Sequence, residues 1–290
     1  MIGRGAVYGM VLMTVAMQIV PFSDGLAKIL TGEHGLSPSQ TAWGRIFFAA
    51  LFLAPVARVH TRFRRGGKSF LRLMRPYWLR GACWAGATLC FFAALKSNPL
   101  PQALSLLFVS PLFVAIAAPF FLREKFLVSR LGLLLAGFAG VLIVLRPASD
   151  DFSPSLLWAL GAGLCYGGYL MATRRGGELG AGAGTFMMML AACILVLPFA
   201  AAEWRTPSLL EWSLMGLMGG LSAAGHFLIT KSCEHAEASQ VAPFNYTEMA
   251  GALAVSYLFF GELPLPLDYA GIALIMSAGV GVAVIDGRQR

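Results

Sequence analysis

The stretch FVSPLFVAIAAPFFLRE, residues 108–124, is apolar until it ends on a charged pair. A second stretch of the same length, YTEMAGALAVSYLFFGE, residues 246–262, is also apolar and also ends on glutamate. The second copy carries an additional carboxylate, Glu248, at the position where the first has Ser110. A segment that occurs twice indicates an internal repeat, and an acid in one copy only indicates that this copy has an additional role.

Matching residues before and after the two stretches extend the repeat. FFAALKS, residues 91–97, precedes the first copy, and HFLITKS, residues 226–232, precedes the second. Downstream, Gly132 and Gly271 are each followed eight residues later by Gly-Val. The matching order of these landmarks predicts a repeat of several consecutive elements.

The composition is that of a membrane protein. Of the 290 residues, 58% are hydrophobic and 12% are charged, and the mean hydropathy is +0.72. Soluble domains carry about 25% charged residues, so the chain falls among membrane proteins. The five cysteines form no CxxC pair and lie mostly in apolar runs, which favours packing over disulfides or metal ligation. No metal-ligand motif is present in the sequence, and we expect neither a metal nor a cofactor.

Ten apolar stretches approach the roughly 20 residues that a bilayer span requires. They cover residues 5–27, 39–58, 78–97, 101–122, 130–146, 154–173, 182–202, 211–230, 239–260 and 267–285. Each must be helical, because lipid offers backbone amides no partner. The repeat divides the chain into two halves of five spans, residues 1–148 and 149–290, which predicts an all-α integral membrane protein with one transport domain.

The net charge of +8 is explained by topology. If the N-terminus lies inside, the inner segments hold 17 of the 22 lysines and arginines. This excess predicts that both termini are cytoplasmic. Anionic lipid headgroups are then the expected partner of the basic residues, and nucleic acid is not.

Because five is an odd number, the two halves would lie in opposite orientations across the bilayer. Inverted repeats around a central cavity are the architecture of many secondary transporters, which work by alternating access. A channel is the other transport class that the spans allow. Saturable, counterflow-stimulated transport would distinguish a carrier from a channel.

The region ALKSNPLPQALSLLFVSPLFVAIAAPFFLREK, residues 94–125, resembles the EamA-type signature of the drug/metabolite transporter superfamily. The second copy is similar to the Tyr-x-Glu-Pro to Gly-Glu segment of that family, with Met249 in place of the proline. The resemblance implies a ten-helix permease of the bacterial inner membrane, and the bacterial aromatic amino-acid exporters are among the members that the chain resembles. It implies export of amino acids, aromatic ones favoured, or of similar amphipathic metabolites. A multidrug carrier or a carrier of other metabolites is the alternative within the same fold.

Glu248 is the main candidate for a binding residue. It lies about ten residues into the span 239–260. A charged acid at the centre of a membrane helix costs about 2.5–3.5 kcal/mol and usually faces a cavity. Glu248 could bind a cationic group of the cargo or carry a proton, and a structural hydrogen bond is the alternative. His226 is expected at a similar depth, either in the cavity or as a packing histidine.

Further candidates follow helical spacing in the spans. The substrate-binding candidates besides His226 and Glu248 are Gln18, Trp84, Phe91, Ser110, Tyr166, Tyr169 and Tyr246. Aromatic side chains with few polar tips suit an amphipathic or aromatic cargo, and core packing is the alternative for each of them. Asp24, Lys28 and Arg45 are expected to form an ion network between helices at the outer rim.

Two prolines are candidate hinges. Pro111 is expected in the middle of a span, where it would remove the hydrogen bond to the carbonyl of Leu107. Pro21, within the first span, is the second candidate. Static kinks packed by their neighbours are the alternative.

A hydrolase is the competing class of function. Ser222 and His226 lie four residues apart in GGLSAAGH, which is similar to a serine–histidine dyad. One turn of a helix is an unfavourable geometry for such a pair, and the sequence offers no oxyanion site. A transporter is therefore the preferred class.

Overall fold

The computed structural model describes residues 4–57, 70–122, 131–145, 153–174, 179–235 and 242–288. Within these ranges the regular structure is helical, and no strand occurs. The first half contains α1 (Arg4–Lys28), the π-helix η1 (Ile29–Glu33), α2 (Pro38–Ala57), α4 (Phe70–Leu95), α5 (Leu100–Leu107), α6 (Ser110–Leu122) and α7 (Leu131–Leu145). The second half contains α8 (Leu156–Arg174), α9 (Ala181–Ala202), α10 (Leu209–His235), η3 (Ala242–Thr247), α12 (Glu248–Val255), η4 (Ser256–Phe260) and α13 (Pro266–Arg288).

Six helices of the described chain are long and apolar enough to cross a membrane. They cover Val7–Glu33, Pro38–Ala57, Met74–Leu95, Leu156–Thr173, Ala181–Ala202 and Leu209–Ser232. Shorter apolar helices cover Glu248–Phe260 and Pro266–Ala278. The prediction of a helical, multi-pass membrane protein is thus confirmed, whereas the ten-span inverted repeat stays a prediction.

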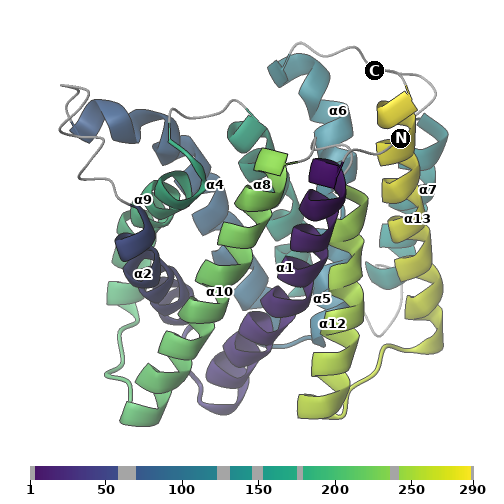
Figure 1. Ribbon diagram of the computed structural model, residues 1–290. Coiled ribbons are helices and arrows are strands. Elements are labelled where there is room, and N and C mark those ends of the chain that lie inside the picture. The colour runs from purple at the N-terminus through teal and green to yellow at the C-terminus, as the bar shows by residue number, and fades with distance from the viewer. Residues whose placement is uncertain are drawn as a thin grey trace.

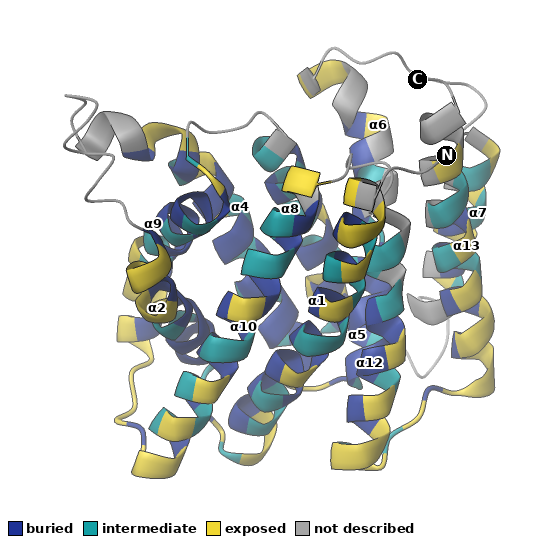
Figure 2. Cartoon of the chain, viewed as in Figure 1, coloured by how far each residue is buried: buried dark blue, intermediate teal, exposed yellow. Residues whose placement is uncertain are grey.

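The large hydrophobic side chains on the outside of the bundle agree with a lipid environment. Phe120, Leu209 and Leu258 are 80%, 85% and 72% exposed, and many similar residues line the outer helix faces. Figure 2 shows these exposed positions on the periphery and the buried ones toward the interior. In water such a surface would be unfavourable, but in a bilayer it contacts lipid tails.

The helices pack in corresponding pairs. The packing of α1 against α10 has a counterpart in the packing of α8 against α4, and α1 against α12 has one in α8 against α6. α2 lies against α9, and α7 lies against α13 (Figure 1). The last two contacts join elements at equivalent positions in the two halves, and the other four form two matching pairs.

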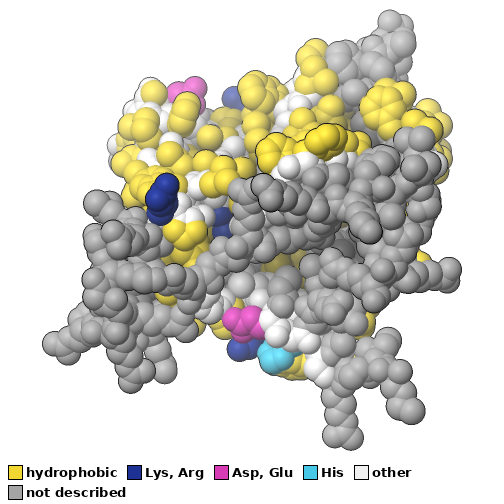
Figure 3. All heavy atoms as spheres, turned by 90° about the horizontal axis from the view of Figure 1, so that it is seen from above, with side chains coloured by type: hydrophobic (Ala, Val, Ile, Leu, Met, Phe, Trp, Pro, Cys, Tyr) yellow, Lys and Arg dark blue, Asp and Glu magenta, His cyan; other side chains and the backbone are white. Residues whose placement is uncertain are grey.

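The start of α1 and the end of α13 lie at the same end of the bundle, the upper end in Figure 1. Seen from that end, in Figure 3, the described side chains are largely hydrophobic, with a small group of charged residues and a histidine. Ranges 58–69 and 123–130, which carry much of the predicted basic excess, lie outside the described residues. The cytoplasmic orientation of this end is therefore a prediction.

The span expected at 101–122 is broken, which corrects the position of Pro111. α5 ends at Leu107 and α6 begins at Ser110, so Pro111 is the second residue of a helix instead of an interior one. A proline in the first turn removes no helical hydrogen bond, because the amides there have no partner within the helix. The equivalent span changes from η3 to α12 at Glu248, the repeat counterpart of Ser110. Both halves interrupt the α-helix at the same position of the repeat.

Close helix contacts depend on particular glycines. A Cβ added at Gly219 on α10 would lie 2.3 Å from Cβ of Phe48 on α2. A Cβ added at Gly216, one turn away, would lie 3.9 Å from the ring of Phe48, an ordinary contact. The closest approach of α2 and α10 therefore requires glycine at 219 and tolerates a methyl group at 216.

Helix α9 is packed through methionine. Met187, Met188 and Met189 are all fully buried, and α9 contacts α2, α4 and α10. Successive residues of a helix point about 100° apart, so the three thioethers lie on three different sides of α9.

Candidate functional site

A cavity of about 40 Å³ lies inside the bundle, between helices of both halves. Five of the predicted binding residues line it: Trp84, Phe91, Tyr166, His226 and Glu248. They come from α4, α8, α10 and α12, so the cavity is where the two halves meet. Most of the remaining lining is apolar, from residues such as Met17, Leu104 and Ile229.

Asp24 and Arg45 also line this cavity, which corrects their placement at the outer rim. Nη1 of Arg45 donates to Oδ1 of Asp24 at 2.7 Å, and Nε of Arg45 donates to Oγ of Ser222 at 3.0 Å. Both charged side chains are almost fully buried. Lys28 does not join them, because it pairs with Glu262. The guanidinium of Arg45 is thus neutralised and hydrogen-bonded within the protein.

Aromatic rings form one wall of the cavity. The ring centroid of Trp84 lies 4.2 Å from that of His226 in an edge-to-face contact, and 6.4 Å from that of Tyr166. Tyr169 lies behind this wall, 5.5 Å from both Trp84 and Tyr166. Nε1 of Trp84 is buried and has no hydrogen-bond partner in the described part of the chain, so this residue of the wall carries an unused donor.

Glu248 begins α12 at the edge of the cavity and is 8% exposed. No hydrogen bond or ion pair joins its carboxylate to a described residue. The first turn of a helix favours a negative charge through the helix dipole, which partly offsets the burial. On the adjacent α1, Nε2 of Gln18 donates to the carbonyl of Thr247 at 2.9 Å. Gln18 does not line the cavity, but it fixes the backbone directly before Glu248.

The serine–histidine dyad is not formed. Oγ of Ser222 accepts a hydrogen bond from Arg45, and neither ring nitrogen of His226 has a partner among the described residues. Instead, the ring of His226 packs against Trp84. A serine without a base cannot be activated as a nucleophile, so this pair does not support hydrolysis.

The other predicted residues whose side chains are described do not belong to the cavity lining. Ser110 is buried at the start of α6, and Tyr169 lies behind the aromatic wall. Pro21 lies within α1 and packs against α12, where a Cβ on Gly251 would lie 3.0 Å from its ring. Tyr246 belongs to η3, but its side chain is outside the described part of the structure. No group of three or more histidine, cysteine, aspartate or glutamate side chains within the described ranges could hold a metal.

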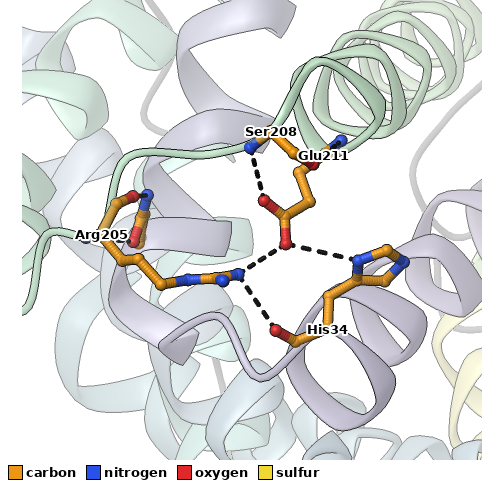
Figure 4. A network of polar contacts seen from close by, with 5 residues as sticks. His34, Arg205, Ser208 and Glu211 are labelled. Carbon is orange, nitrogen blue, oxygen red and sulfur yellow. Dashed lines mark hydrogen bonds and ion pairs between the residues drawn. The ribbon is translucent and has the colours of Figure 1, made fainter.

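A second polar network, which sequence reasoning missed, lies at the end of the bundle away from the termini. Oε1 of Glu211 accepts from Nη2 of Arg205 at 2.5 Å and lies 3.3 Å from Nδ1 of His34 (Figure 4). Oε2 of Glu211 accepts from the amide of Ser208 at 2.7 Å, while Oγ of Ser208 accepts from the amide of Glu211. This is a capping box, and the Ser-x-x-Glu pattern before an apolar run could have identified it. The network joins the segment between α1 and α2 to the start of α10.

Comparisons with known proteins agree with the fold and the repeat. The sequence profile of the EamA-like transporter family matches twice, at residues 7–146 and 153–284. An S-adenosylmethionine uptake transporter of Rickettsia bellii is 27% identical over 260 residues, covering 88% of this chain and 86% of the relative. A riboflavin transporter of Vibrio cholerae is 30% identical over 196 residues, covering 66% and 65%. A pseudopaline exporter of Pseudomonas aeruginosa is 28% identical over 232 residues, covering 78% and 81%.

Solved structures with the same fold include a crystal structure of another protein. This crystal structure of another protein has a TM-score of 0.62 and 16% sequence identity, and the match covers 99% of this chain and 98% of that chain. The family profile covers nearly all of this chain in two consecutive copies. The chain therefore belongs to the EamA-like transporter family, within the drug/metabolite transporter superfamily.

Proposed function

We propose that the chain is a secondary transporter that exports an amino acid, or an amino-acid derivative with an aromatic ring, across the inner membrane. The observation that carries the proposal is the buried carboxylate of Glu248, which has no partner among the described residues and lines a cavity with an aromatic wall. The carboxylate would bind the ammonium group of the cargo, and Trp84 and Tyr166 would contact its ring.

The charges in the cavity favour a cargo with a cationic group. Asp24 and Arg45 neutralise each other, so Glu248 is the carboxyl group of the cavity lining that has no counter-ion among the described residues. An unpaired buried charge is costly in a membrane interior, and binding a cation there lowers that cost. A proton is the smallest such cation, so Glu248 could also couple transport to a pH gradient.

Alternating access is supported by the arrangement of the two halves. The family profile matches each half separately, and the helix contacts of one half have counterparts in the other. The cavity of about 40 Å³ has room for a few waters only, at about 10–15 Å³ for each. A metabolite would therefore enter only after the helices part on one side, as a carrier requires.

The relatives support a cargo of this type. S-adenosylmethionine, named for the uptake transporters of Rickettsia, combines an amino-acid group with an aromatic base. The relatives include an uptake transporter and an exporter, so export by this chain rests on the resemblance to aromatic amino-acid exporters.

The test is a transport panel in proteoliposomes. Labelled tryptophan, phenylalanine, S-adenosylmethionine, riboflavin and a cationic drug would be compared, with and without a pH gradient. We expect saturable transport of the amino-acid cargoes that is stimulated by counterflow. Exchange of riboflavin or the drug without exchange of any amino-acid cargo would refute the proposal in favour of another metabolite or drug carrier.

A further inference from the structure

Arg80 is a buried cation outside the cavity lining. It lies on α4 one turn before Trp84, on the side toward the end of the bundle that carries the termini. Arg80 is only 7% exposed. Its guanidinium carbon lies 5.4 Å from the ring centroid of Tyr169. Nε and Nη2 are buried and have no hydrogen-bond partner among the described residues.

This environment leaves Arg80 with free binding capacity. A cation–π contact contributes about 0.5–2 kcal/mol, but it does not satisfy the planar donors of a guanidinium. Burying a charge without a hydrogen-bonded counter-ion is costly, and unsatisfied buried donors add to that cost. Arg45 provides the comparison, because its donors reach both Asp24 and Ser222. Arg80 has no such carboxylate among the described residues.

Arg80 is connected to the aromatic wall of the cavity through Tyr169. Tyr169 lies between Arg80 and the aromatic wall, in contact with Trp84 and Tyr166. Glu248 lines the same cavity as Trp84 and Tyr166. The described interior thus holds a carboxyl group in the cavity and a guanidinium, each without a hydrogen-bonded partner, with aromatic rings between Arg80 and the cavity. A zwitterion carries one group for each of them.

We propose that Arg80 binds the carboxylate of the cargo when the helices part on the side of the termini, in a step separate from the binding of its ammonium group by Glu248. This inference rests on the proposed function and names its substrate class, a zwitterion in preference to a simple cation. A guanidinium binds a carboxylate through two parallel hydrogen bonds, and Nε with Nη2 is one edge that can do so. Burial inside the bundle separates Arg80 from lipid headgroups, so the anion it receives comes through the transport path.

The experiment compares three indole probes that differ in charge, using the full-length protein in detergent. Tryptophan carries both charged groups, tryptamine carries only the ammonium, and indole-3-propionate carries only the carboxylate. Benzoate serves as a second carboxylate probe. Binding is measured by ligand-induced thermal stabilisation for the wild type, Arg80→Gln and Arg80→Lys. Arg75→Gln is the matched control, because Arg75 is an exposed arginine on the same helix.

We expect Arg80→Gln to weaken binding of tryptophan and both carboxylate probes about 10- to 100-fold, as the loss of a charged hydrogen-bond pair predicts. Tryptamine should bind within about twofold of wild type, and Arg75→Gln should leave all probes unaffected. Arg80→Lys keeps the charge but loses the planar pair of donors, so it should show a smaller loss for carboxylates. If Arg80→Gln fails to fold, Arg80→Lys carries the same comparison.

Three results would overturn the inference: equal weakening of all probes, unchanged binding of the carboxylates, or no carboxylate binding by the wild type. The proposed function fails separately. Carboxylate binding that depends on Arg80 without amino-acid transport would retain the anion site and refute the function. Amino-acid transport with an unchanged KM in Arg80→Gln would retain the function and refute the anion site.

Discussion

Replacing Asp24 by asparagine tests whether the buried ion pair stabilises the bundle. Asparagine keeps the shape of the side chain but removes the charge, so Arg45 would remain charged in a site where both side chains are 3–4% exposed. Removing one partner of a buried pair costs about 3–5 kcal/mol, because the other charge stays buried without compensation. We expect Asp24→Asn to lower the free energy of unfolding by this amount.

The measurement is reversible unfolding by sodium dodecyl sulfate in mixed micelles, with two comparison variants. Lys231→Gln removes an ion pair with Glu234 whose side chains are 41% and 39% exposed, and should cost less than about 1 kcal/mol. The double variant Asp24→Leu with Arg45→Met removes both buried charges and should be as stable as wild type or more so. The reasoning is refuted if Asp24→Asn costs no more than Lys231→Gln, or if the double variant is less stable than Asp24→Asn.

Four further results are expected. Glu248→Gln should insert and fold normally but raise the KM for amino acids, with a smaller effect on cargo that lacks an ammonium group. If Glu248 instead carries a proton, the response to a pH gradient should disappear while counterflow exchange persists. Wild-type rates in both assays would exclude either role. Pro111→Ala should lower turnover more than affinity, because alanine lets the broken span continue as one helix, and unchanged turnover would leave only a static break. Gly219→Ala should lower the free energy of unfolding by about 1–3 kcal/mol through overpacking, whereas Gly216→Ala should be nearly neutral; equal effects would contradict the packing. Reporter fusions should place residue 290 in the cytoplasm, and an external reporter would contradict the inverted repeat.

The sequence was sufficient for the helices because a bilayer imposes one requirement on every span. Continuous apolar stretches of about 20 residues predict helices without reference to their neighbours. Hydropathy does not show where a helix breaks within an apolar stretch, so Pro111 was placed inside a helix that in fact begins at Ser110. The helices before and after the break, α5 and α6, are both apolar, so polarity does not mark the break.

Charged residues were harder to place because their depth depends on helix packing. Glu248 lines the cavity, and an acid inside an apolar span has few other positions that avoid lipid. Asp24 and Arg45 were assigned to the rim from their place near span ends, but the packing of α1 and α2 places them in the cavity wall. Arg80 was counted with the inner basic residues, because a tally of charges does not distinguish a buried guanidinium from one in water.

The three methionines of α9 give this helix an interface that tolerates displacement. Thioether side chains are unbranched and polarisable, so they fill irregular spaces in several rotamers at similar energy. Branched side chains at 187–189 would lock α9 into one arrangement against α2, α4 and α10, because close-packed interiors resist change of shape. With methionine on three sides, α9 can shift against its neighbours and repack at each position. Such plasticity would let the same buried contacts serve more than one conformation of the carrier without an empty space forming in either.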